Sequence, residues 1–279
     1  MARITSDSLS RSKTQPESSY DNLLSSKGKP KLEVCNLFKS YGKQGKQLTV
    51  LANVNLQLYP RELVCIVGAS GCGKSTLLNI IAGLVQPSSG EVRVDNEVVL
   101  GPGSDRGMVF QGYTLYPWLT VAQNIGFGSK LRSLSKEQRK QRIGYFLEVV
   151  GLTRFAKAYP KQLSGGMKQR VAIARALANE PEVLLMDEPF GALDAQTKEQ
   201  MQQFLLELWE QTHTTILMIT HDVEEAVFLS QRLYVMSAHP GKIKEEMAIA
   251  LPEKRDVEIK LDSEFISIKR HIVHALRDD

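Results

Sequence analysis

The sequence predicts an α/β fold, in which a parallel sheet is covered by helices and a helical segment is inserted near the middle of the chain. The first observation is a set of short apolar runs of the kind that form strands buried on both faces. They cover residues 62–67, 183–186, 216–219 and 233–236. The second is that helical patterns alternate with these runs, which is typical of a parallel sheet. The third is that residues from about 113 to 177 look helical.

The chain before the first buried run has strand-like patterns. One begins at Leu32, and apolar residues alternate with polar ones again over residues 54–58. A hairpin is expected over residues 92–99, with its turn at Asp95 and Asn96.

Local signals mark several helix ends. A helix is expected from Lys74 to about Gly83, directly after the first buried run. Within the inserted segment, Ser135 and Gln138 match a capping box, and Gly151 is expected to end the helix that they begin.

Apolar stripes predict two further helices. The first stripe comprises Met201, Phe204, Leu205 and Leu208. The second comprises Phe265, Ile268, Ile272 and Leu276, with Asp262 as the expected cap. We expect the last helix to pack on the rest of the chain rather than to act as a sensor.

Composition limits the class of protein. Among the 279 residues, 35 Lys and Arg stand against 31 Asp and Glu, and a net charge of +4 does not favour a nucleic-acid partner. No run of 18 apolar residues occurs, so no membrane-spanning segment is expected. Residues 1–30 are rich in Ser and Lys, which predicts a disordered arm rather than a signal peptide. Three cysteines without a CxxC spacing indicate a reducing cytosol and neither a disulfide framework nor a zinc site.

Residues 68–75, GASGCGKS, match the phosphate-binding pattern G-x-x-x-x-G-K-[ST] between an expected strand and an expected helix. The glycines let backbone N–H groups point at phosphate oxygens, and the helix start adds partial positive charge. Lys74 is expected to reach the β- and γ-phosphates, and Ser75 to bind Mg²⁺. The residues predicted to contact ATP here are Gly68, Ala69, Ser70, Gly71, Cys72, Gly73, Lys74, Ser75 and Thr76. The alternative is a glycine-rich turn without a ligand, which this context disfavours.

Cys72 lies inside this loop at a helix start, where a thiolate is stabilised. One hypothesis is that alkylation of Cys72 blocks ATP binding. The other is that a small side chain simply fits there.

Asp187 and Glu188 follow the second buried run directly. Ligands of an open α/β sheet bind at the carboxyl ends of its strands. Asp187 is therefore expected to hold Mg²⁺, and Glu188 to polarise the attacking water. Without the glycine-rich loop, an ordinary solvated acidic pair would be the better interpretation.

Residues 163–170, LSGGMKQR, resemble the signature segment of ATP-binding cassette (ABC) ATPases. Ser164 is expected to cap a helix whose first turn carries Gly165 and Gly166, so that backbone N–H groups form a second anion site. Met167 stands where many members carry Gln, but the Ser-Gly-Gly segment is intact. The resemblance covers roughly residues 31–240.

The resemblance implies a P-loop NTPase sheet with an antiparallel β subdomain and a helical subdomain that carries the signature. The ATPase domain is expected over residues 31–245, with the helical insert at about 113–178. Residues 246–279 would then form a C-terminal extension with a short helix.

The resemblance also implies roles for four more residues. Tyr41 is similar to the aromatic residue that stacks on adenine, and Gln111 to the glutamine that touches Mg²⁺ and the attacking water. Asp194 falls in the loop that meets the partner subunit, and His221 resembles the histidine that contacts the γ-phosphate. Taken alone, a loop Tyr or a strand-end His is more often an ordinary structural residue.

The same resemblance implies partners. Because the insert carries the signature away from its own cradle, a second ABC ATPase subunit, identical or different, is expected to complete each site. Integral membrane permease subunits and, indirectly, a solute-binding protein are expected, which would place the chain at the cytoplasmic face of the inner membrane. Residues 114–119, including Trp118, either line the groove for a permease helix or pack within the insert.

Residues 105–111, 116–119 and 237–243 are similar to the ATPases of nitrate, sulfonate and taurine importers, to which cyanate and bicarbonate importers are close. The expected function is therefore ATP hydrolysis coupled to import of a small anion. An ABC-type ATPase for another cargo, or one outside transport, is the alternative. A chromosome-maintenance ATPase would need a long heptad coiled coil within the cassette, and the sequence has none.

Overall fold

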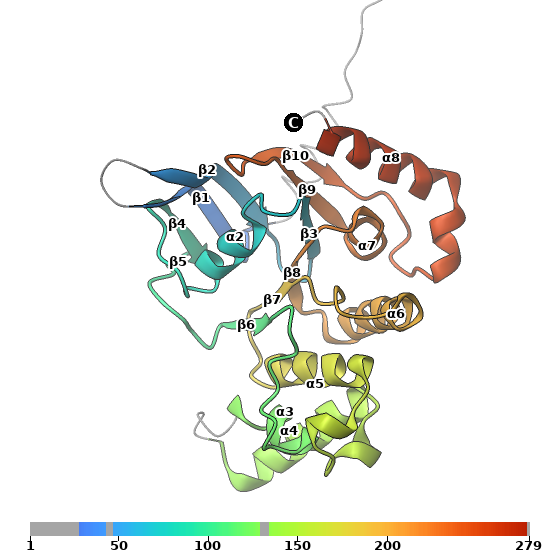
Figure 1. Cartoon of the computed structure of the whole chain (residues 1–279). Coiled ribbons are helices and arrows are strands. Elements are labelled where there is room, and N and C mark those ends of the chain that lie inside the picture. Colours follow the sequence, from blue (N-terminus) through green and yellow to red (C-terminus); the bar gives the residue numbers. More distant parts are fainter. Residues whose placement is uncertain (1–27, 43–46, 129–133, 278–279) are drawn as a thin grey trace, which may run out of the picture.

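The computed structural model describes residues 28–42, 47–128 and 134–277 (Figure 1). Apart from residues 28–30, the predicted N-terminal arm lies outside the described residues. A six-stranded sheet has the spatial order β10 (Ile243–Ala248), β9 (Arg232–Met236), β3 (Leu63–Gly68), β8 (Thr215–Thr220), β7 (Val183–Asp187) and β6 (Arg106–Val109). Its neighbours pair in parallel except for β10, which is antiparallel to β9. The parallel sheet predicted from the buried runs is confirmed.

A second, four-stranded sheet precedes and flanks the first. Its order is β2 (Leu48–Leu58), β1 (Leu32–Tyr41), β4 (Ser89–Val94) and β5 (Glu97–Val98). The turn between β4 and β5 has left-handed backbone at Asp95 (φ 49°) and Asn96 (φ 67°), as a two-residue hairpin requires. The predicted hairpin is therefore confirmed.

Helices lie on both faces of the large sheet. They are α2 (Lys74–Ile81), α3 (Val121–Ile125), α4 (Lys136–Val149), α5 (Gly165–Leu177), α6 (Ala195–Thr212), α7 (Val223–Leu229) and α8 (Ser263–Arg277). Short 3-10 turns occur at Thr153–Phe155, Pro160–Gln162 and Val257–Leu261. The predicted capping box is present, since Ser135 Oγ accepts from Gln138 N at 3.1 Å and Ser135 N donates to Gln138 Oε1 at 2.9 Å. None of the helices in the described ranges has both the length and the hydrophobicity of a membrane span.

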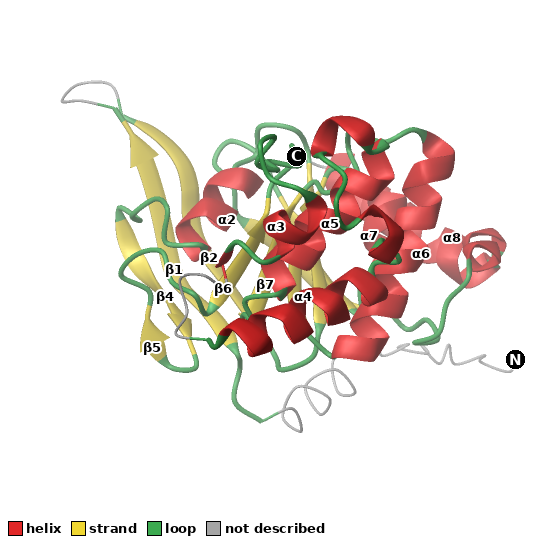
Figure 2. Ribbon diagram, turned by 90° about the horizontal axis from the view of Figure 1, so that it is seen from below, coloured by secondary structure: helices red, strands yellow, loops and turns green. Residues whose placement is uncertain are grey.

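Strand β3 divides the core into two layers, which explains its continuous apolar run. Val64 and Ile66 belong to the layer that contains α2 and the antiparallel sheet, whereas Cys65 and Val67 belong to the layer that contains α5, α6 and α7. Figure 2 shows these layers, with the antiparallel strands on one side and the larger helices on the other. Helix α8 buries Phe265 against the second layer, so the predicted packing of this helix is confirmed.

Arg232 joins several strands through one buried guanidinium group. The side chain is 2% exposed and donates to Glu62 Oε2 at 2.6 Å and to the carbonyl oxygen of Gln57 at 2.7 Å. It also forms an ion pair with Glu246 on β10. One side chain therefore connects β2, the entrance to β3, β9 and β10.

Replacing Arg232 by methionine is expected to lower the free energy of unfolding by about 3–5 kcal/mol, because the buried Glu62 carboxylate loses its ion pair. Urea denaturation followed by circular dichroism measures this change. Arg93→Met is the control, since Arg93 pairs with Glu91 where both side chains are well exposed, and its loss is expected to cost less than about 1 kcal/mol. Equal losses in the two variants would contradict the role given to Arg232.

Candidate nucleotide-binding site

The loop between β3 and α2 curls back at the carboxyl end of its strand. Gly71 and Gly73 have φ of +82° and +103°, a region that favours glycine. A Cβ atom on Gly68 would lie 2.8 Å from Cys72 Sγ and 2.8 Å from the carbonyl oxygen of Met236. The shape of this loop, called the cradle below, therefore requires glycine at these three positions.

Lys74 lies with its ammonium group inside the cradle. The residue is 4% exposed, and its Nζ donates to the carbonyl oxygens of Gly68 at 2.7 Å and Ala69 at 2.9 Å. Because Lys74 is also the first residue of α2, its charge and the positive end of the helix dipole act at the same place. Both favour a phosphate group there.

Ser75 and Asp187 meet at the edge of the cradle. Ser75 Oγ donates to Asp187 Oδ1 at 3.1 Å, which joins the first turn of α2 to the end of β7. Burial raises the pKa of Asp187, and the hydrogen bond from Ser75 opposes this effect. A hydroxyl and a carboxylate oxygen are ligands that suit Mg²⁺, so the two residues fit the metal predicted for them.

Two side chains converge on one carboxylate oxygen of Glu188, the residue after Asp187. Glu188 Oε2 lies 2.9 Å from His221 Nδ1 and 3.5 Å from Gln111 Nε2. Glu188 has a left-handed backbone (φ 42°), and its N–H donates to the carbonyl of Ile219 on β8 at 3.0 Å. The ends of the neighbouring strands β6, β7 and β8 thus bring together three residues that are far apart in the sequence.

A network missed by sequence reasoning holds His221 in place. The next residue, Asp222, caps α7 by accepting from Glu225 N at 3.2 Å, and it forms an ion pair with Lys198 of α6. Burial raises the pKa of Asp222, but hydrogen bonds from Lys198 and the helix backbone outweigh it, and the net shift is downward. The Asp-x-x-Glu capping pattern at residues 222–225 was the only signal of this role in the sequence.

The Ser-Gly-Gly segment begins α5, as predicted. Ser164 Oγ accepts from Met167 N at 3.3 Å. A Cβ atom on Gly165 would lie 3.0 Å from the Tyr113 hydroxyl, and one on Gly166 would lie 2.9 Å from Thr197 Cγ2. None of the hydrogen bonds between described residues joins this segment to the cradle of its own chain.

Asp194 and Tyr41 are two further residues that were predicted for the site. Asp194 caps α6 by accepting from Thr197 N at 3.0 Å, and hydrogen bonds from the Thr197 backbone lower the pKa of this carboxyl group. Tyr41 is 44% exposed and pairs with Leu48, two residues before Val50, whose side chain approaches Gly73. Tyr41 therefore lies on the part of the antiparallel sheet that borders the cradle.

Cys72 and Gly241 form the back of the cradle. Cys72 is 1% exposed, so a thiol reagent reaches it only after local opening, and the small-side-chain interpretation is favoured. A Cβ atom on Gly241 would lie 2.2 Å from the carbonyl oxygen of Cys72. Sequence reasoning missed this contact, because it depends on the return of the chain after β9 to the loop after β3.

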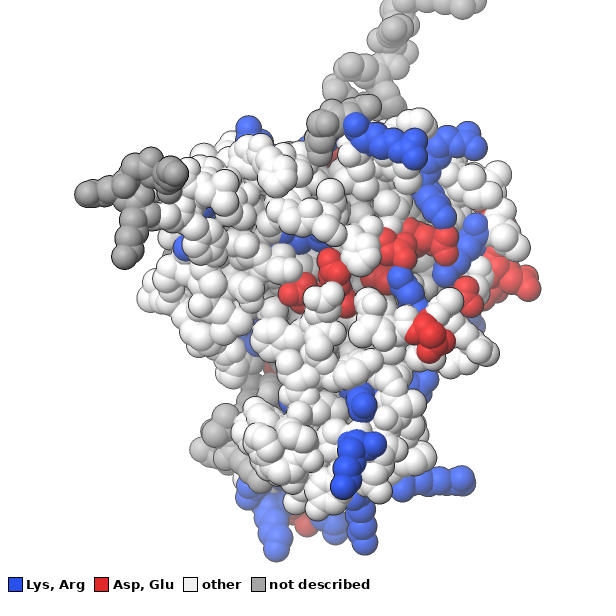
Figure 3. All heavy atoms as spheres, viewed as in Figure 1, with Lys and Arg blue, Asp and Glu red and all other residues white. Residues whose placement is uncertain are grey.

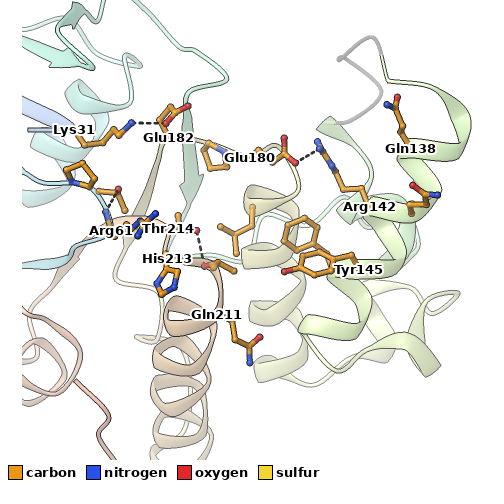
Figure 4. Close-up of a pocket in the computed structure, with 17 residues that line it drawn as sticks. Lys31, Arg61, Gln138, Arg142, Tyr145, Glu180, Glu182, Gln211, His213 and Thr214 are labelled. Carbon is orange, nitrogen blue, oxygen red and sulfur yellow. Dashed lines mark hydrogen bonds and ion pairs between the residues drawn. The ribbon is translucent and has the colours of Figure 1, made fainter. Parts of the chain in front are cut away.

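A cavity of about 800 Å³ lies at the opposite edge of the large sheet (Figure 4). The starts of β7 and β8 and one face of α4 line it. An ion pair between Arg142 and Glu180 and another between Lys31 and Glu182 (2.9 Å) cross its rim. None of the cradle residues lines this cavity, because the cradle follows the carboxyl end of β3.

The fold and the cradle define a P-loop nucleotide-binding protein. The family described as ABC transporter matches residues 51–191. The nitrate import ATP-binding protein NrtD of Synechocystis sp. is 55% identical over 84% of this chain and 91% of its own length. An aliphatic sulfonates import ATP-binding protein SsuB from Bacillus cereus is 46% identical over 83% of this chain and 90% of its own length. A taurine import ATP-binding protein TauB from Pseudomonas entomophila is 46% identical over 82% of this chain and 90% of its own length.

A dimeric, post-hydrolysis structure of the ATP-binding cassette MJ0796 with ADP and Pi has a TM-score of 0.68 and 37% identity, over 79% of this chain and 100% of that one. The chain therefore belongs to the ABC transporter family and is an ATPase of the nitrate, sulfonate and taurine group. The fold class, the ATP binding and the ATPase activity predicted from the sequence are confirmed.

Proposed function

We propose that this chain is the ATPase subunit of an importer for a small anion of the nitrate or nitrite, sulfonate or taurine, cyanate or bicarbonate type. The cargo class rests on the similarity to the nitrate, sulfonate and taurine import proteins. One observation supports the proposed catalytic activity. His221 and Gln111 converge on one carboxylate oxygen of Glu188, beside the Ser75–Asp187 pair.

In the proposed reaction, water attacks the γ-phosphorus of ATP, the bond to the bridging oxygen breaks, and ADP and phosphate are released. Glu188 accepts a hydrogen bond from that water and orients it. Lys74 and His221 stabilise negative charge on the transferring phosphoryl group. Mg²⁺ held by Ser75, Asp187 and Gln111 would supply further charge stabilisation.

The site needs a second subunit in this proposal. The Ser164 helix start, which forms no hydrogen bond to its own cradle among the described residues, would face the γ-phosphate bound by a neighbouring chain. Asp194 and the residues before it would border the same interface, and Tyr41 would stack on adenine. The dimeric state of the similar cassette supports this arrangement. ATP that binds the closed dimer better than open subunits shifts the population toward closure.

We also propose the division of the chain into an ATPase domain over 31–245, a helical insert at about 113–178 and an extension over 246–279. Permease subunits in the inner membrane would hold the chain peripherally at the cytoplasmic face and couple dimer closure to transport. A solute-binding protein would act through those permeases. Trp118, with 69% of its surface exposed, provides a large apolar contact for a permease helix.

Trp118→Ala is expected to leave the fold and the basal ATPase activity unchanged but to lower the yield of the assembled complex at least about tenfold, as for an interface hot spot. Co-purification with tagged permease measures the yield. The control is Tyr145→Ala, since Tyr145 is a comparably exposed aromatic (52%) that lines the cavity described above. Normal assembly of the Trp118 variant would favour packing within the insert instead.

The function as a whole is tested by affinity purification of the tagged chain from detergent-solubilised membranes. We expect integral permease subunits to co-purify, and the ATPase rate of the reconstituted complex to rise with a solute-binding protein loaded with a small anion. A complex whose ATPase rate responds to another class of cargo, or a chain without membrane partners, would contradict the proposal.

A further inference from the structure

The helical insert carries most of the positive charge of the protein. Residues 113–178 contain 12 Lys and Arg and two Glu, a net charge of +10. The rest of the chain contains 23 Lys and Arg against 29 Asp and Glu, a net charge of −6. The modest total of +4 therefore hides a strong separation of charge between two parts of one molecule.

Of the ten of these cations that lie in the described ranges, only Arg142 forms an ion pair with another described residue. Six of the other nine lie on the first turns of α4 and in the segment between α4 and α5, and we call them the basic surface: Lys136, Arg139, Lys140, Arg154, Lys157 and Lys161. Figure 3 shows Lys and Arg with few Asp and Glu at the end of the molecule that the insert forms; Asp and Glu on this face lie nearer to α6 and α7, below a second group of Lys and Arg in the region of α8.

The second segment of the basic surface packs beside α3 and includes an exposed aromatic residue. Backbone hydrogen bonds from Val121 N to the carbonyl of Ala158 (2.9 Å) and from Ala122 N to that of Ala156 (3.0 Å) fix the backbone around Lys157 beside the start of α3. Tyr159 (42% exposed) lies between Lys157 and Lys161 in the sequence. An exposed Tyr among lysines is typical of protein surfaces at a membrane interface.

We propose that the basic surface rests against the anionic phospholipid headgroups of the membrane that holds the permease. This inference depends on the proposed function only for the location of the chain at a membrane. The cations are spread over two segments rather than gathered around a pocket, which suits a charged plane better than a small anion or one acidic side chain. At physiological salt the attraction acts within about 8 Å, so it requires direct apposition of the insert to the lipid.

The test measures how the full-length purified chain partitions onto vesicles of phosphatidylcholine with 30% phosphatidylglycerol, compared with phosphatidylcholine alone. Each cation near an anionic surface contributes about a factor of five to the partition coefficient. The triple variant Lys136→Gln, Arg139→Gln, Lys140→Gln is therefore expected to bind the anionic vesicles roughly a hundredfold more weakly. The double variant Lys157→Gln, Lys161→Gln is expected to bind them roughly twenty-five-fold more weakly.

The matched control neutralises three exposed cations outside the insert, Lys242→Gln, Lys254→Gln and Arg270→Gln, and is expected to change the partition coefficient less than about twofold. Soluble glycerol phosphate at the headgroup concentration should not release the protein. Equal loss in the control, binding to neutral vesicles, displacement by glycerol phosphate, or an effect of the variants on self-association instead of vesicle binding would each overturn the inference. The ATPase rate and ATP-dependent dimerisation in vesicle-free solution are measured in parallel, so that failure of the proposed function is seen separately.

Discussion

Glu188→Gln is expected to lower the rate of ATP hydrolysis by roughly 10²–10⁴-fold while ATP binding is retained. Glutamine has nearly the same volume as glutamate and can still hydrogen-bond to His221 and Gln111, so the strand end should keep its shape. The amide lacks the negative charge that orients and polarises the attacking water. Dimers held by unhydrolysed ATP should therefore accumulate. Size-exclusion chromatography with ATP and Mg²⁺ would detect these dimers, and a phosphate-release assay would measure the rate of hydrolysis.

Glu182→Gln is the matched control for this experiment. Glu182 lies one residue before the first residue of β7, at the opposite end from Glu188, and its carboxylate pairs with Lys31 at 2.9 Å. Loss of the Glu182 carboxylate is expected to change turnover less than about twofold, because Glu182 lies at the amino end of β7 and ligands of such a sheet bind at the carboxyl ends of its strands. Normal turnover in the Glu188 variant would remove this residue from the catalytic role.

The parts of the fold that were predictable are those that local sequence determines. The run at residues 62–67 predicts a strand because both faces of β3 are buried, and the hairpin at Asp95 and Asn96 is visible because the turn needs left-handed residues. The register of the pairing between β1 and β2 could not be predicted from the sequence. Its register shifts between Val34 and Leu37 and again beyond Leu37, and such bulges depend on the neighbouring strand.

The residues that meet at the ends of β6, β7 and β8 were named from the sequence, but their arrangement in space was not. That Gln111 and His221 both reach the same oxygen of Glu188 follows from the strand order β6-β7-β8, which no local pattern encodes. The Lys198–Asp222 ion pair was not predicted for a similar reason, because it joins α6 to the start of α7. Gly241 has no room for a side chain because the chain after β9 passes close to Cys72 in the cradle. This contact is made only in the folded protein, so the sequence around Gly241 does not predict it.

A mixture of two inactive variants is expected to recover ATPase activity. Lys74→Ala removes the cation in the cradle, and Ser164→Arg blocks the anion site at the start of α5. Each alone should lower turnover at least about 10²-fold, as does the loss of one group that stabilises the transferred charge. If each site combines the cradle of one chain with the Ser164 helix of the other, a heterodimer of the two variants contains one intact site. Random pairing makes half of the dimers mixed, so an equimolar mixture should show roughly a quarter of the wild-type rate.

The recovery distinguishes a shared site from one that a single chain completes. Were the Ser164 helix to serve the cradle of its own chain, neither variant would contain an intact site, and mixing would change nothing. The control pairs Lys74→Ala with the double variant Lys74→Ala, Ser164→Arg, because this mixture has no intact cradle and should stay inactive under either arrangement. An inactive mixture of the two single variants, alongside an active wild-type chain, would contradict closure between copies of this protein. Because Ser164 is exposed and contributes one cap to α5, its replacement should cost only about 1 kcal/mol of stability, and circular dichroism can show that the variant used in the mixture is folded.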